Sequence, residues 1–126
     1  MANHDKNRQL IYFNSRDRLI RIDLQKTMYF ESYGNYSYVT TTDNQKAYLN
    51  ISLSQVEEVI GKRFGKSGNV FLRIGKRFVV NSSYIYQIDI TKQCLMLSDM
   101  GQACVRLSVS KNALVLLKKL LVENNV

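Results

Sequence analysis

The chain has 126 residues, 45% of them hydrophobic, which is enough for the core of one domain and too little for two. Eighteen Lys and Arg against ten Asp and Glu give a formal net charge of +8, which favours a polyanionic partner such as nucleic acid, with an anionic membrane surface as the competing partner. No apolar run approaches the roughly 18 residues of a membrane-spanning helix, and the N-terminus lacks the apolar core of a signal peptide. We therefore expect no membrane insertion and a cytoplasmic location.

Short apolar runs separated by turn-forming residues predict a mostly β fold. Residues 1–9 are polar and without periodicity, so we expect a flexible N-terminal tail followed by one domain over residues 10–126. Runs rich in β-branched and aromatic residues then alternate with clusters of Gly, Asn, Asp and Ser. The expected strands cover residues 10–13, 18–22, 27–33, 36–42, 46–51, two runs within 71–81, 84–90, 93–98 and 103–109.

Two segments have helical periodicity instead. Ser52 is an N-cap with Gln55 as its capping-box partner, so a short amphipathic helix follows Ser52 and ends at Gly61 and Gly65. Ser110 caps a terminal helix whose apolar stripe we assign to core packing, with a dimer surface as the lesser alternative. The stripe consists of Ala113, Leu114, Leu117, Leu120 and Leu121.

The register of one predicted hairpin decides whether the two cysteines can meet. If residues 99–102 form the turn, Ser98 lies opposite Ala103 and Cys94 opposite Leu107. Side chains alternate between the faces of a sheet, so on this register Cys94 and Cys104 point to opposite sides, whereas a slip of one residue would place them on one face. We therefore expect free, buried thiols.

The most basic part of the chain surrounds residues 71–81, FLRIGKRFVVN. From Val59 to Ile88 there is no Asp or Glu, while the basic residues are Lys62, Arg63, Lys66, Arg73, Lys76 and Arg77. Lys76 and Arg77 fall between two apolar runs, so we interpret them as contacts for phosphate or base groups in preference to a solvated hairpin tip. We expect Asn81 to be structural and Glu31 to pair with a basic neighbour.

The chain lacks the residues that common catalytic and metal sites need. Its only histidine, His4, lies in the polar N-terminal segment, and its six glycines form no Walker-type or dinucleotide-binding pattern. We therefore expect no enzyme activity, no cofactor and no metal. A helix-turn-helix is excluded because predicted strands separate the two helices, and residues 76–80 match an RNA-recognition strand motif only faintly.

Four segments together resemble the LytTR family of bacterial DNA-binding domains. Residues 28–36, MYFESYGNY, are similar to the family's Y-I-E-x-x-x-N-Y signature, and residues 52–53 with the following helix resemble its S-L-x-x-L/V-E segment. Residues 71–81 resemble F-x-R-I-H-K/R-S-Y/F-I/V-V-N, and residues 107–111, LSVSK, resemble L/I-P-V-S-R. These segments follow the family's order and spacing, so the resemblance covers about residues 10–121.

The resemblance implies about ten short strands in small antiparallel sheets, with a short internal helix and a C-terminal helix. It also implies that loops at one edge enter successive major grooves of double-stranded DNA and bend it. The base-contacting candidates at the corresponding positions are Asn35, Tyr36, Ser37, Lys76, Arg77, Ser110 and Lys111. The phosphate-contacting candidates are Arg16, Arg18, Arg63 and Arg73.

The chain departs from the family pattern at three of these positions. Gly75 stands where the family usually has His, Arg77 where it usually has Ser, and Lys111 where it usually has Arg. A Lys keeps the charge but lacks the planar fork that binds two acceptors at once. These differences affect the preferred base sequence more than DNA binding itself.

We therefore expect a sequence-specific DNA-binding domain of a bacterial transcriptional regulator, of the type that serves as the output domain of response regulators in two-component systems. Only about ten residues precede the first strand, so we expect no receiver domain, and Met1 favours a stand-alone regulator over a piece of a longer protein. The family commonly occupies paired sites, which implies a second copy on paired or repeated half-sites. The alternatives are an RNA-binding module and a basic interaction domain at an anionic membrane surface.

Overall fold

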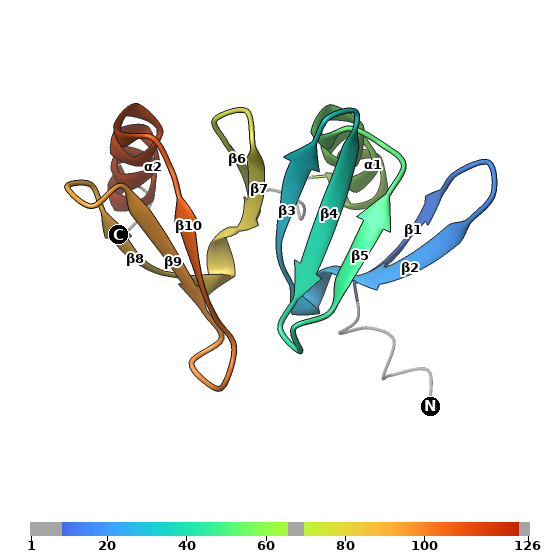
Figure 1. Cartoon of the computed structure of the whole chain (residues 1–126), viewed down its shortest axis with the longest axis horizontal. Coiled ribbons are helices and arrows are strands. Elements are labelled where there is room, and N and C mark those ends of the chain that lie inside the picture. Colours follow the sequence, from blue (N-terminus) through green and yellow to red (C-terminus); the bar gives the residue numbers. More distant parts are fainter. Residues whose placement is uncertain (1–8, 66–69, 124–126) are drawn as a thin grey trace.

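The computed structural model describes residues 9–65 and 70–123, and Figure 1 shows the mostly β fold predicted from the sequence. Apart from Gln9, the expected tail over residues 1–9 lies outside the described residues. The strands are β1 (Leu10–Asn14), β2 (Leu19–Asp23), β3 (Thr27–Tyr33), β4 (Tyr36–Thr41), β5 (Lys46–Leu49), β6 (Phe71–Ile74), β7 (Phe78–Asn81), β8 (Ile85–Asp89), β9 (Cys94–Ser98) and β10 (Cys104–Ser108). The helices are α1 (Leu53–Phe64) and α2 (Lys111–Glu123).

The strands form three antiparallel sheets, of which the central one supports the other two. Its strand order is β5-β4-β3-β7-β6, so β3 lies in the middle and pairs with β4 on one side and β7 on the other. A second sheet has the order β10-β9-β8, and β1 and β2 form a two-stranded ribbon. Figure 1 shows α1 behind the central sheet, with the second sheet and α2 beyond β6 and β7.

One face of the central sheet packs against α1 and the β1–β2 ribbon. Phe30 on β3 lies between Val39 on β4 and Val79 on β7, and these three side chains share one face because antiparallel partners in register do so. The helix presents its predicted apolar stripe to them, and the ribbon adds Ile11 and Phe13. The ring of Phe13 meets that of Phe30 edge to face, with 6.0 Å between the ring centres.

The opposite face of the same sheet forms a second core with β8, β9, β10 and α2. Tyr29 on β3 and Val80 on β7 are partners in register, and they pack with Leu95 and Leu97 of β9 and with Leu114 of α2. An irregularity in β3 between residues 27 and 29 locally breaks the alternation, and Met28 and Tyr29 both join this core. Because neighbouring residues of β3 enter different cores, one strand holds both halves of the molecule together.

The caps predicted for both helices are present. Gln55 N donates to Ser52 Oγ over 3.3 Å, and Ser52 N donates to Gln55 Oε1 over 2.9 Å, which completes the capping box of α1. The helix continues through Gly61 and ends at Phe64, so of the two glycines only Gly65, with φ +56°, terminates it. At α2, Ala113 N donates to Ser110 Oγ over 3.3 Å.

The apolar stripe of α2 is only partly in the core. Leu114 and Leu117 are buried, while Ala113 and Leu121 are half-buried against the second core. Leu120 is 41% exposed and lies outside the packed face, contrary to the prediction from its spacing.

The predicted register of the β9–β10 hairpin is wrong by one residue. Ser98 pairs with Cys104, so residues 99–103 form a five-residue loop. The Asp99 carboxylate fills this loop and stabilises it, because Oδ1 accepts hydrogen bonds from both Gly101 N and Ala103 N. The one-residue slip moves Cys94 and Cys104 to the same face, where they remain free and lie four positions apart along the paired strands. Cys104 is exposed and Cys94 is half-buried, so the expected burial of the two thiols is wrong.

Asn81 joins the two halves of the chain at the end of β7, which confirms its predicted structural role. Its side chain is 4% exposed; Nδ2 donates to Thr27 O over 3.0 Å and to Leu24 O over 3.4 Å. Its Oδ1 accepts from Ser83 N over 3.0 Å and so starts the turn towards β8. The side chain therefore fixes the β2–β3 connection and the β7–β8 connection at the same time.

Removing this buried amide should weaken the whole fold. In the variant Asn81→Ala the free energy of unfolding should fall by about 1–3 kcal/mol, because buried backbone groups lose their partners. Urea denaturation followed by circular dichroism measures the change. Asn50→Ala, at an exposed position, is the matched control and should change stability by less than about 0.5 kcal/mol. Equal stability of the two variants would contradict the structural role of Asn81.

Candidate nucleic-acid interface

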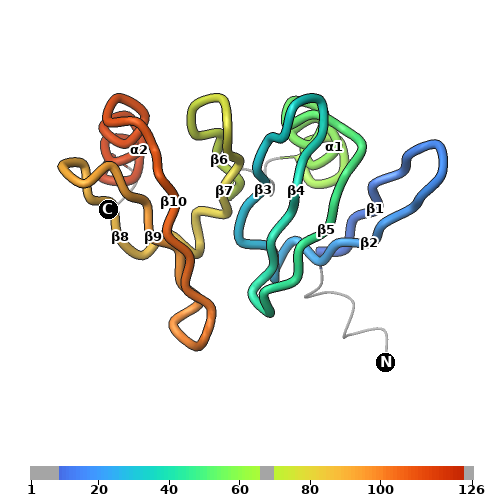
Figure 2. Tube along the Cα trace, in the orientation of Figure 1, coloured from blue at the N-terminus to red at the C-terminus, as the bar shows by residue number. Residues whose placement is uncertain are grey.

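Several chain reversals meet at one end of the central sheet, uppermost in Figure 2. Glu31 near the end of β3 is paired with Tyr38 of β4 and Phe78 of β7, so the β3–β4 turn and the β6–β7 turn must lie beside each other. Ser32 N donates to Arg77 O over 2.8 Å and links them directly. A groove lined by residues 74–78, 108–110 and Ala113 places the β10–α2 junction against the β6–β7 turn. We call residues 34–36, 75–77 and 108–111 the loop edge.

The β3–β4 turn presents two of its three candidate residues. Tyr33 pairs with Tyr36, and a two-residue turn of this kind needs positive φ, which Gly34 supplies at +64°. Asn35 is exposed at the tip and Tyr36 is 42% exposed. Ser37 is fully buried, and its Oγ donates to Ile51 O over 2.8 Å, so it points away from any partner and does not fit the predicted base contact.

The β6–β7 turn presents Lys76 and Arg77 in different ways. Lys76 is exposed at the tip and forms no ion pair with any described residue. Arg77 Nη2 lies 2.6 Å from Glu31 Oε2, which confirms that Glu31 pairs with a basic neighbour, and the guanidinium lies 5.1 Å from the centre of the Phe78 ring. The Arg77 side chain stays 62% exposed, so part of its fork remains accessible while the carboxylate fixes its direction.

Arg73 supports the β6–β7 turn by donating to the backbone of the turn. Its Nε donates to Gly75 O over 3.0 Å and its Nη2 to Lys76 O over 3.4 Å, while Nη1 lies 2.6 Å from Glu57 Oε1 on α1. With these partners the guanidinium is committed to the protein, so the arrangement does not fit the predicted phosphate contact. The side chain instead joins α1 to the turn that carries Lys76.

At the β10–α2 junction the N-terminus of α2 lies at the loop edge, and no acidic side chain of its first turn offsets the positive end of the helix dipole. Ser110 is exposed while its Oγ caps α2, and Lys111 is the exposed first residue of the helix. No acidic residue occurs in the first turn. The positive end of the helix dipole and Lys111 both favour an anion in front of this end.

The remaining arginine candidates lie on two other elements. Arg16 and Arg18 are exposed in the β1–β2 turn. Arg18 Nη2 donates to Tyr48 O over 2.8 Å, which holds this turn against β5. The contact lies near the end of β5 at which Leu49 pairs with Ser37. Arg63 lies in the last turn of α1 over the Phe64 ring, whereas the first turn of α1 is the one near the loop edge. Arg63 is therefore separated from the other candidates, and Lys66 lies outside the described residues.

A cluster of four tyrosines, on the same face of the central sheet as Tyr29 but towards the β4–β5 edge, was missed by the sequence reasoning. The ring centres of neighbours in the series Tyr33, Tyr38, Tyr48 and Tyr36 are 5.2–5.4 Å apart. Partial burial, with smaller effects from Tyr36 and Tyr38, raises the pKa of Tyr48 above its usual value. The period-two spacing of Tyr36 and Tyr38, together with the predicted turn at residues 34 and 35, could have revealed that these rings share a face with Tyr33.

Residues 9–65 and 70–123 contain neither a candidate metal site nor a helix that could span a membrane. No group of three or more His, Cys, Asp or Glu side chains lies close enough together to hold a metal ion in this part of the chain. Neither described helix is long and apolar enough to cross a membrane.

Comparisons with known proteins agree with this geometry. The family description "LytTr DNA-binding domain" matches residues 17–122, which is most of the predicted range. Among solved structures, the LytTr DNA-binding domain of a protein described as a methyl-accepting/DNA response regulator from Bacillus cereus is similar, with 26% identity and a TM-score of 0.62. The similarity covers 89% of this chain and 95% of that one. No curated protein sequence matches. The chain belongs to the LytTR family of DNA-binding domains.

Proposed function

We propose that this domain binds double-stranded DNA sequence-specifically through the loop edge and acts as the DNA-binding part of a bacterial transcriptional regulator. The observation that carries the proposal is the convergence of Asn35, Lys76 and Lys111 from three separate chain reversals onto one exposed edge. The Asn35 amide both donates and accepts hydrogen bonds, whereas the two lysines only donate, so together they can distinguish adenine from guanine in a major groove. Family membership supports the same partner.

The proposed contacts divide into those that read bases and those that meet phosphates. Asn35 can bind adenine with its amide, and Lys76 and Arg77 can donate to O6 and N7 of guanine. Tyr36, Ser110 and Lys111 complete the set near the bases, while Arg16 and Arg18 meet the backbone on the far side of the β3–β4 turn. Ser37 and Arg73 are not included, because the protein itself occupies their polar groups.

Glu31 has a defined role in this scheme. A carboxylate near DNA repels phosphates unless a cation compensates it, and Arg77 provides that cation at 2.6 Å. The ion pair also restricts the rotamers of Arg77, which reduces the entropy lost when its remaining donors meet a base. We further propose that a second copy occupies a neighbouring half-site, because the family to which the chain belongs commonly occupies paired sites.

The partner class can be tested directly against the two alternatives. A duplex DNA library with a randomised core should yield an enriched sequence, and binding to that duplex should be tighter than to single-stranded RNA or to anionic lipid vesicles at equal ionic strength. Fluorescence anisotropy and vesicle sedimentation measure the three affinities. Tighter binding to RNA or to vesicles would overturn the DNA proposal.

Removing the side chains at the tip of the β6–β7 turn should weaken binding to the enriched duplex. Lys76→Ala and Arg77→Ala should each reduce the binding free energy by ~1 to 3 kcal/mol and relax the preference at one position, if the side chains read bases. A phosphate contact would instead weaken binding to all sequences alike and flatten the salt dependence. Lys46→Ala is the matched control, because it removes one charge from the end of β5 that is paired with Thr40, away from the loop edge. Unchanged affinity in both tip variants would reject this part of the site.

If Arg73 supports the β6–β7 turn, removing its partner Glu57 should weaken DNA binding. Glu57→Gln keeps the charge of Arg73 but removes the carboxylate that holds it against the β6–β7 turn, so binding to the enriched duplex should weaken by about 0.5–1 kcal/mol. Loss of an acidic group would by itself strengthen binding to DNA. Glu58→Gln, next to it on the exposed side of α1 and paired with Lys62, is the control and should show no weakening. Stronger binding by Glu57→Gln would mean that Arg73 is freed to contact phosphate.

A further inference from the structure

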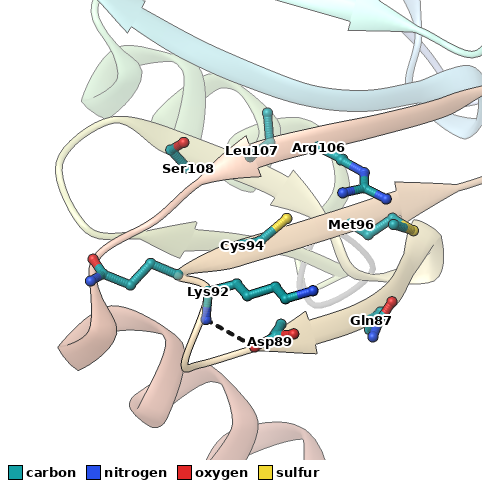
Figure 3. A pocket seen from close by; sticks show the side chains of 9 residues that line it. Gln87, Asp89, Lys92, Cys94, Met96, Arg106, Leu107 and Ser108 are labelled. Carbon is teal, nitrogen blue, oxygen red and sulfur yellow. Dashed lines mark hydrogen bonds between the residues drawn. The ribbon is translucent and has the colours of Figure 1, made fainter.

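The outer face of the β8–β9–β10 sheet, turned away from the second core, contains a hollow that is lined by none of the side chains proposed to contact DNA. Its volume is about 350 Å³. Pockets for small organic ligands have volumes of roughly 300–1,000 Å³, so the space suffices for one small molecule. Figure 3 shows the side chains of Lys92 and Arg106 on either side of it, with Cys94 and Met96 between them.

The sheet register explains why these four side chains meet. Met96 pairs with Arg106 and with Gln87, and Asp89 pairs with Cys94, so all of them point to the face opposite Leu95 and Leu97. Lys92 reaches the hollow from the β8–β9 turn, where its backbone N donates to Asp89 Oδ1 over 2.9 Å. The hollow therefore combines a cation at each side with a floor of one thiol and one thioether.

The lining of the hollow carries more positive than negative charge. Neither Lys92 nor Arg106 forms an ion pair with a residue of the described part of the chain. Asp89 is the only carboxylate among the lining residues, and one of its oxygens already accepts from the backbone. Two cations at one concave surface repel each other, and an anion placed between them would relieve the repulsion.

We propose that this hollow binds a small organic anion. Its carboxylate or phosphate group lies between Lys92 and Arg106, where the guanidinium can donate two parallel hydrogen bonds. Its apolar part covers the half-buried Cys94 and Met96, whose polarisable sulfur atoms adapt to flat or irregular ligands. Gln87 supplies an amide at the rim for a further polar group of the ligand.

The lining favours a small molecule over a DNA backbone as the occupant. A phosphate chain gains nothing from an apolar floor, and the carboxylate of Asp89 disfavours a polyanion that lies across the whole face. A compact anion can place its single charged group at the two cations and its apolar part on the sulfur atoms. The binding site itself does not depend on the proposed DNA contacts.

The hollow is connected to the loop edge by the backbone. Ser108 lines both the hollow and the groove beside the β6–β7 turn. Val109 N donates to Gln93 O over 3.1 Å, which ties the β8–β9 turn to the segment that leads into Ser110. A ligand that restrains the β8–β9 turn would therefore also restrain the start of α2, and this consequence rests on the proposed function.

Amide chemical shifts of the ¹⁵N-labelled protein without DNA test the site, with benzoate and phenyl phosphate as the probes. We expect saturable shifts confined to residues 87–96 and 106–109, and none with benzamide, which has the same ring without the charge. Arg106→Gln and Lys92→Gln should each reduce the affinity for the better probe about tenfold. Arg21→Gln, an exposed cation on β2, is the control and should bind as the unaltered protein does.

Three outcomes would overturn the proposal. Shifts from both probes that spread over basic residues across the surface would show non-specific attraction. Shifts that persist unchanged in Arg106→Gln and Lys92→Gln would place the anion elsewhere. Lower duplex-DNA affinity of both variants, with no probe-induced shifts in the unaltered protein, would make the two cations phosphate contacts. The first two results are obtained without DNA, so they do not depend on whether the loop edge reads DNA.

Discussion

The fold depends on β3, which is paired along both edges and buried on both faces. Phe30 faces the core under α1 while Tyr29 faces the core under β9, so a shift of one residue in β3 would exchange the two cores. The same pairing places the β3–β4 and β6–β7 turns side by side. The stability of the domain and the geometry of its loop edge are thus consequences of one register, and a variant that disturbs this register would damage both together.

The charge around the β6–β7 turn is less positive in the folded structure than the sequence alone suggests. Residues 59–88 contain no acid, yet two arginines of this run reach carboxylates from elsewhere: Arg73 pairs with Glu57 and Arg77 with Glu31. The segment is therefore less electropositive in space than in sequence. The two carboxylates do not remove the DNA-binding capacity of this edge, because each of them orients a guanidinium. Glu57 holds Arg73 against the turn, and Glu31 holds Arg77 with part of its side chain exposed. Lys76 keeps its full charge between these two restrained neighbours.

The sequence was sufficient for most of the architecture, because strand periodicity, turn residues and the Ser52 and Ser110 caps are local signals. It failed where a single side chain alters a loop. Asp99 accepts two backbone N–H groups and adds a residue to the turn, so Cys94 and Cys104 lie on one face of the hairpin instead of on the predicted opposite faces. Site residues were harder to predict than strands. The alternation that exposes Tyr36 also buries Ser37. The orientation of the Arg73 side chain depends on Glu57, a partner sixteen residues away on a different element.

Gly75 shows how such an edge can change its target while keeping its fold. Its φ of +61° belongs to the region that Gly enters freely and that Asn, Asp and His enter at modest cost. A Cβ built there meets no atom within 4 Å, so a larger side chain would extend outwards from the turn without displacing its neighbours. The β6–β7 turn is held by Arg73 and by the Ser32–Arg77 backbone bond, neither of which involves a side chain at residue 75. Residue 75 is thus a position at which a change to Asn, Asp or His can alter recognition at a modest cost in folding, whereas bulkier or β-branched residues would strain the turn.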